Sequence, residues 1–185
     1  MKYFTRSMWR GAQQTGVQAD ENHRKWQEAF QQYSVDLAAI RGRLSEAAYS
    51  FFNEADVHDG ELMELRLIDG SRPAPLSASV REWQTVVSYP VKAELGVLDA
   101  VDQFVWHVSY SALRRAVIDY PGEETLFYQQ GEGFGDWGYH ELTDAGNGFL
   151  RHEVLFRSGS TLTFELREIA VKKTLARGPA PRGDR

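Results

Sequence analysis

Four groups of residues contain the side-chain types that catalysis or metal binding would need. The first is His58 followed by Asp59, within the run Asp56-Val57-His58-Asp59-Gly60. An imidazole beside a carboxylate can bind a divalent metal or transfer protons. The aspartates and Gly60 are also common turn residues. We therefore expect a turn that leads into a strand, and we keep a metal or acid–base role for His58 and Asp59 as the alternative.

The second group lies in a predicted hairpin with His140-Glu141 on one arm and His152-Glu153 on the other. Two registers are open. One places each histidine opposite a glutamate, and such cross-strand pairs contribute about 0.2–1 kcal/mol each. A register one residue longer breaks both pairs and places the two histidines on one face. The sequence does not choose between them, and His140 or His152 could also join a metal site.

The third group is the glycine-rich run from Gly131 to Tyr139. It lacks the Lys and Ser/Thr of a phosphate-binding loop, and its glycines do not connect a strand to a helix. Its aromatic side chains, Phe134, Trp137 and Tyr139, could present a binding surface or cover one end of the core. The second role is favoured, because large aromatic residues bury about 150–250 Å² when a core is within reach.

The fourth group is the serines, none of which lies in a Gly-x-Ser-x-Gly motif. Nucleophilic serine catalysis therefore has no support. We assign no catalytic, cofactor-binding or metal-binding residue and predict no cofactor. The sequence favours a protein that is not an enzyme, without deciding the question.

The elements that position these groups follow from a change of hydrophobic period near residue 53. Between Trp26 and Phe51 large apolar residues recur every three or four positions. This spacing predicts a helix over about 21–52, capped by Asp20 and with a candidate break at Gly42. Thr5 is the expected N-cap of a shorter first helix. After Ala55 the period becomes two, which predicts strands, the clearest over residues 85–95.

Together these patterns predict an α+β fold, with N-terminal helices packed on one face of a curved antiparallel sheet of about six to eight strands. We expect a single domain over residues 1–173, helical in 1–53 and sheet-forming in 54–173. Residues 174–185 are expected to form a disordered tail. The helical stripe could also serve self-association, and the oligomeric state stays open.

Composition narrows the classes of function. The chain has no cysteine, which excludes disulfides, thiolate metal sites and a cysteine nucleophile. Residues 1–53 carry a net charge of about +2 and residues 54–173 about −9. Such an acidic sheet would repel nucleic acid and attract a basic protein. Because no signal-peptide core or long apolar run is present, we expect a cytoplasmic protein that does not enter membranes.

Three segments resemble a bacterial family of proteins of unknown function. They are the start Met1-Lys2-Tyr3-Phe4-Thr5, the strand start Val57-His58-Asp59-Gly60, and the late block Gly135-Asp136-Trp137-Gly138-Tyr139 with Arg151-His152-Glu153-Val154-Leu155-Phe156. The resemblance implies no catalytic residues. A looser similarity, carried by His58-Asp59 and the acidic sheet, is to immunity proteins of bacterial toxin systems.

The resulting prediction is a non-enzymatic protein-binding domain, immunity-like in its most specific form, with a basic protein as partner. The alternative is a metal-dependent enzyme or metal-binding protein that uses His58 and Asp59.

Overall fold

The helices come first in the chain and the strands follow, as the change of hydrophobic period predicts. The computed structural model describes residues 1–13, 17–55, 57–70, 91–101, 103–120 and 133–176. The helices are α1 (Arg6–Ala12), α2 (Val17–Ala39) and α3 (Glu46–Asn53), with a short 3-10 helix η1 (Arg41–Arg43) before α3. The strands are β1 (Gly60–Asp69), β2 (Val91–Leu98), β3 (Phe104–Ser111), β4 (Arg115–Asp119), β5 (Asp136–Gly146), β6 (Phe149–Phe156), β7 (Thr161–Leu166) and β8 (Glu168–Leu175).

The long helix expected over residues 21–52 is two helices, and the break includes Gly42, which lies in η1. A new helix starts at α3 because the Ser45 hydroxyl accepts a hydrogen bond from the Ala48 amide at 3.2 Å. The predicted N-cap Thr5 is confirmed by its bond from the Met8 amide at 3.3 Å. The prediction for Asp20 is wrong, since α2 begins at Val17 and Asp20 lies inside its first turn.

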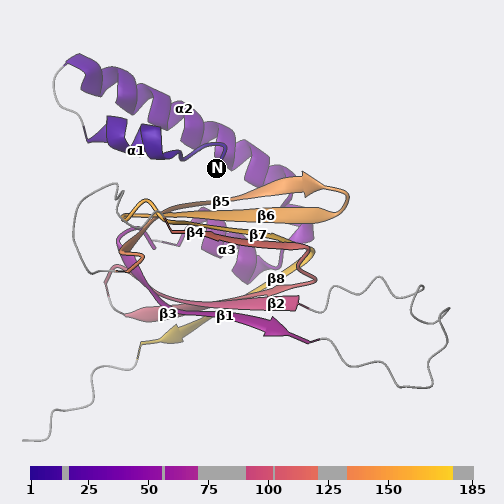
Figure 1. Cartoon of the computed structure of the whole chain (residues 1–185). Coiled ribbons are helices and arrows are strands. Elements are labelled where there is room, and N and C mark those ends of the chain that lie inside the picture. The colour runs from indigo at the N-terminus through magenta and orange to yellow at the C-terminus, as the bar shows by residue number, and fades with distance from the viewer. Residues whose placement is uncertain (14–16, 56, 71–90, 102, 121–132, 177–185) are drawn as a thin grey trace, which may run out of the picture.

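All eight strands belong to one antiparallel sheet, in the order β4-β7-β6-β5-β1-β2-β3-β8. An antiparallel α+β fold is therefore confirmed. The ladder between β3 and β8 continues into the ladder between β4 and β7. Two backbone bonds bridge the bends, from the Arg114 amide to the Glu165 carbonyl and from the Arg167 amide to the Ser111 carbonyl. The sheet curls, so β5, β6 and β7 face β1, β2 and β3 across α3 (Figure 1).

The arrangement of all helices on one face of the sheet is not confirmed. Tyr139 and His140 are consecutive in β5 and point to opposite faces. The Tyr139 ring packs against Trp9 and Trp26 of α1 and α2, with ring centroids 5.2 and 4.5 Å away. The His140 ring packs against Phe51 of α3, at 5.1 Å. Helices α1 and α2 thus lie over the outer face of β5, while α3 lies inside the curl (Figure 1).

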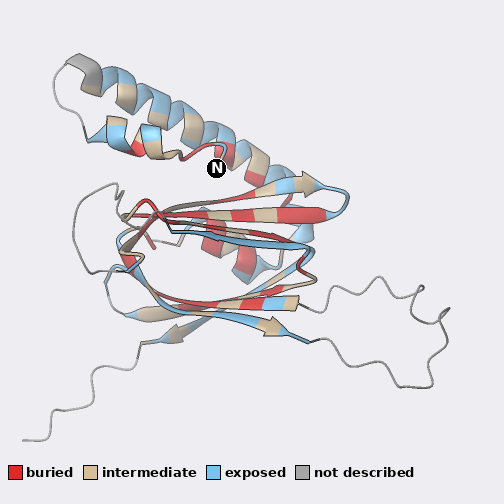
Figure 2. Ribbon diagram, viewed as in Figure 1, coloured by how far each residue is buried: buried red, intermediate tan, exposed pale blue. Residues whose placement is uncertain are grey.

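The main hydrophobic core lies around α3. Figure 2 shows buried residues on α3 and on the strand faces that surround it. Phe51 of α3, Val97 of β2 and Phe156 of β6 are fully buried there.

The first part of the strand predicted over 85–95 and the tail predicted to be disordered lie largely outside the described residues. Among the described helices, none combines the length and the apolar character needed to span a membrane.

Candidate functional site

The structure settles the register of the β5–β6 hairpin. Glu141 lies opposite Glu153, and Leu142 lies opposite His152. This is the longer of the two registers, in which no histidine faces a glutamate. Both histidines point inward to α3, and both glutamates point outward to the chain start and α2. The four polar residues are therefore divided between two separate sites.

The outward glutamates bind the first four residues of the chain. The Glu141 carboxylate is completely buried and accepts hydrogen bonds from the backbone amides of Lys2, Tyr3 (2.8 Å) and Phe4 (3.2 Å). The α-amino group of Met1 forms an ion pair with Glu153 at 2.8 Å. Three N–H donors compensate the free-energy cost of burying this carboxylate. This part of the hairpin is a structural clamp.

The inward histidines form a hydrogen-bonded chain with Tyr110. Hydrogen bonds join the Tyr110 hydroxyl to His152 Nδ1 at 2.6 Å and His152 Nε2 to His140 Nδ1 at 3.3 Å. Burial lowers the pKa of His140 to about 3. Burial, and then the nearby His140, lower the pKa of His152 well below its usual value. Both imidazoles are therefore neutral near pH 7.

The surroundings of this chain are aromatic. Phe52 packs on both imidazoles, with ring centroids 5.3 Å from His140 and 4.9 Å from His152. The indole N–H of the fully buried Trp137 finds no acceptor among the described residues. These contacts explain why both imidazoles are neutral. His152 is completely buried, whereas His140 keeps part of its surface exposed.

His58 lies on the other side of β5 from His140 and His152. Its Nδ1 is 2.7 Å from the Gly138 carbonyl oxygen, and its ring lies 4.7 Å from that of Tyr139. Its Nε2 is 3.7 Å from the Asp59 carboxylate. The described residues contain no cluster of three or more His, Cys, Asp or Glu that could hold a metal ion. His58 and Asp59 are thus brought together, but without His140 or His152.

The aromatic residues of the glycine-rich run belong to the core, as the favoured interpretation expects. Trp137 is completely buried, and Phe134 packs on Phe156 with ring centroids 5.0 Å apart. Tyr139 is half-buried between α1 and α2. Gly131 and Glu132 lie outside the described residues.

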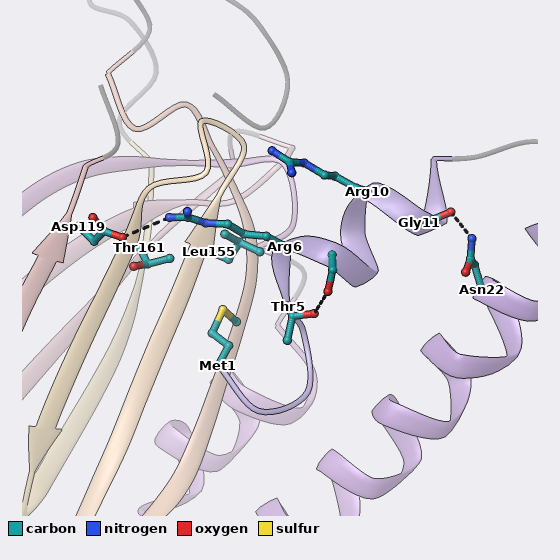
Figure 3. Close-up of a pocket in the computed structure, with 10 residues that line it drawn as sticks. Met1, Thr5, Arg6, Arg10, Gly11, Asn22, Asp119, Leu155 and Thr161 are labelled. Carbon is teal, nitrogen blue, oxygen red and sulfur yellow. Dashed lines mark hydrogen bonds and ion pairs between the residues drawn. The ribbon is translucent and has the colours of Figure 1, made fainter. Parts of the chain in front are cut away.

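An open groove lies between α1 and the ends of β4, β6 and β7. We call it the α1 groove, and its volume is about 950 Å³. Its lining residues are Met1, Thr5, Arg6, Ser7, Arg10, Gly11, Asn22, Asp119, Leu155 and Thr161. Figure 3 shows Arg6 and Arg10, one helical turn apart, extending from the same side of α1.

The two arginines of the α1 groove differ in their partners. Arg6 Nη2 forms an ion pair with the Asp119 carboxylate at 3.3 Å. Arg10 is exposed, and no described residue neutralises its guanidinium group. On the far side, the Asn22 amide nitrogen donates to the Gly11 carbonyl at 2.8 Å and ties α1 to α2 (Figure 3). The α1 groove therefore offers one neutralised and one available positive charge.

A second group of arginines lies at the other end of β4, around Glu165. The Glu165 carboxylate is nearly buried and pairs with Arg114 at 2.7 Å and Arg151 at 2.8 Å. The Arg115 guanidinium lies 3.8 Å from the same carboxylate and is more than half exposed. Burial acts to raise the pKa of Glu165, but the hydrogen bonds and charges of Arg114 and Arg151 together outweigh it and lower the pKa. We call these four residues the Glu165 cluster.

Many carboxylates of the acidic sheet have partners inside the molecule. Besides the three glutamates above, Asp99 accepts from the Gln103 amide at 2.8 Å. Asp136 pairs with Arg157 at 2.8 Å, and Asp144 pairs with Arg43 at 3.0 Å. These carboxylates are therefore not free to attract a basic partner.

Sequence reasoning did not identify the α1 groove or the Glu165 cluster. The i, i+4 spacing of Arg6 and Arg10 on a predicted helix was the only signal available. The ion pair of Arg6 with Asp119 depends on a contact between segments more than a hundred residues apart.

No protein family, curated protein or solved structure matches the chain in the three comparisons made. The resemblances to an uncharacterised bacterial family and to immunity proteins therefore stay predictions.

Proposed function

We propose that the chain is a non-enzymatic protein-binding domain and that the α1 groove is part of its binding surface. The observation that carries this proposal is the open groove with the guanidinium of Arg10, which no described residue neutralises. Binding sites commonly have volumes of about 300–1,000 Å³ and a few placed polar groups. The α1 groove is within this range.

The neighbouring strand supports a polypeptide as the ligand. Asp119, at the end of β4, lines the α1 groove, and all five residues of β4 are exposed. A groove that continues into an exposed strand suits an extended chain better than a compact small molecule. An immunity-like role remains the most specific form of this proposal. A basic partner remains a prediction from net charge alone.

A library of random displayed peptides, selected on the full chain, tests this function. Ser7→Trp would fill the α1 groove from its lining, since Ser7 is exposed on α1. Gln31→Trp is the matched control, because Gln31 is exposed on α2 and does not line the groove. We expect selected peptides that bind the original chain and the Gln31→Trp variant but lose affinity for Ser7→Trp. Peptides that bind all three proteins equally would contradict the proposal.

A further inference from the structure

We propose that the partner presents an extended acidic segment, which lies along β4 with its carboxylates at the arginines near the two ends of this strand. This inference rests on the proposed function and specifies the chemistry of the partner.

The first argument is the position of β4 in the sheet. β4 pairs with β7, and it has no second neighbour among the described strands. Its residues are exposed on both faces, and Ile118 keeps 45% of its surface accessible. An edge strand presents unpaired N–H and C=O groups that can pair with an added strand.

The second argument is the placement of charge. At one end of β4 the Glu165 cluster has three guanidinium groups for one carboxylate. At the other end Arg6 pairs with Asp119, and Arg10 lines the same groove, so two guanidinium groups share one carboxylate there. Positive charge thus exceeds negative charge at both ends, although the whole chain has a net charge of −5. This local excess complements an acidic ligand.

The third argument is that both ends are on the same side of the sheet. Arg115 lies opposite Glu165, and Asp119 lies opposite Thr161. Residues two apart in a strand share a face, so Arg115 and Asp119 point to the same side. Asp119 and Thr161 line the α1 groove, which places that side toward α1. Four residues of a strand span about 13 Å, so one short extended segment can reach both ends.

Fluorescence anisotropy with three labelled peptides of equal length tests this inference. The peptides alternate Thr with Glu, with Gln or with Lys, so that they differ in charge and share the tendency to be extended. The proteins are the full chain and its variants Arg10→Gln, Arg115→Gln and Arg24→Gln. Arg24 is the control, since it is exposed on α2 and pairs with Glu28 of the same helix.

We expect the Glu peptide to bind about ten times more tightly than the Gln peptide. Arg10→Gln and Arg115→Gln should each weaken its binding about two- to fivefold, the range that exposed ion pairs support, and Arg24→Gln should not. The preference should shrink as ionic strength rises from about 0.01 to about 0.15 M, because the screening length falls from about 30 to about 8 Å.

If the three peptides bind equally and Ser7→Trp still weakens their binding, the inference of an acidic segment is wrong and the proposed function stands. Binding that no variant changes would contradict both. Sedimentation of the chain without peptide tests whether a second copy of the chain occupies this surface instead. A dimer that Arg115→Gln dissociates would overturn the inference in favour of a second copy of the chain.

Discussion

Glu141 and His140 are neighbours in β5 and lie in contrasting environments. Glu141 is completely buried, and its carboxylate accepts hydrogen bonds from three backbone amides. None of these three donors carries a charge. His140 faces aromatic rings and the neutral His152, and burial lowers its pKa. The backbone geometry of a strand separates these two environments, because consecutive side chains point to opposite faces.

Replacing Glu141 by Ala should destabilise the fold by about 2–4 kcal/mol, since it leaves several buried N–H groups without an acceptor. Urea unfolding followed by fluorescence measures the free energy directly. Glu61→Ala is the matched control, because Glu61 is an exposed glutamate of β1. Equal losses for the two variants would show that the clamp on residues 1–4 contributes nothing.

The buried histidines predict a loss of stability in mild acid. Their folded pKa values lie below the unfolded value of about 6.5, so below that pH the unfolded chain binds protons that the folded protein does not. Stability should therefore fall from about pH 6.5 toward pH 3, the folded pKa of His140. The expected loss is about 2 kcal/mol per histidine between pH 7 and pH 5.

Free energies of unfolding measured at pH 7 and at pH 5 test this predicted loss of stability. His140→Gln, which keeps a polar side chain without a titrating group, should remove about half of the difference. The exposed His23 provides the control His23→Gln, which should leave the difference unchanged. An identical pH dependence in all three proteins would mean that the histidines do not cause it.

At the scale of elements, the contact between α1 and β5 depends on the absence of a side chain at Gly138. A Cβ atom at this position would lie 2.3 Å from the Trp9 ring and 2.7 Å from the Leu155 carbonyl oxygen. Trp9 is the buried residue of α1 and anchors this helix to the sheet. The approach of α1 therefore sets the position of Arg6 and Arg10 in the α1 groove.

Gly138→Ala should displace α1 and lower the free energy of unfolding by about 1–3 kcal/mol, the usual cost of overpacking. It should also weaken any ligand of the α1 groove. Gly42→Ala is the control, because no heavy atom lies within 4 Å of a Cβ at Gly42. We expect this control to keep or raise stability. Thermal unfolding of both variants, with peptide titration as above, decides the outcome.

At the scale of the whole molecule, the two halves of the curled sheet are joined by bent strands and by the core around α3. The chain bends between β3 and β4, where Ala112 has a φ of 54°. Phe51 of α3 contacts Trp106 of the β3 half and His140 of the β5 half, with ring centroids 5.3 and 5.1 Å away. Both halves therefore share one set of core contacts.

This sharing predicts a single unfolding unit. The slowest-exchanging amides of β2 and β6 should report the same opening free energy. Phe51→Ala should lower both by the same amount, about 3–5 kcal/mol, because it opens a cavity between the halves. Hydrogen exchange resolved by NMR measures both strands in one experiment. A loss confined to one half would show that the halves unfold independently.

The sequence by itself determined the order of helices before strands, the cap at Thr5 and the turn between the arms of the β5–β6 hairpin. These features depend on hydrophobic period, capping and turn residues, which act over a few neighbouring positions. The inward position of the aromatic residues Phe134 and Trp137 also followed from their type, because large rings gain most from burial.

Only the tertiary structure decided the hairpin register, the position of α3 inside the curl and the grouping of arginines at the two ends of β4. A shift of one residue in the β5–β6 pairing exchanges the faces of all its side chains, and the packing of α3 and the chain start selects between the two. The ion pair of Arg6 with Asp119 joins residues 113 positions apart. Such contacts depend on the path of the whole chain, so no local pattern in the sequence encodes them.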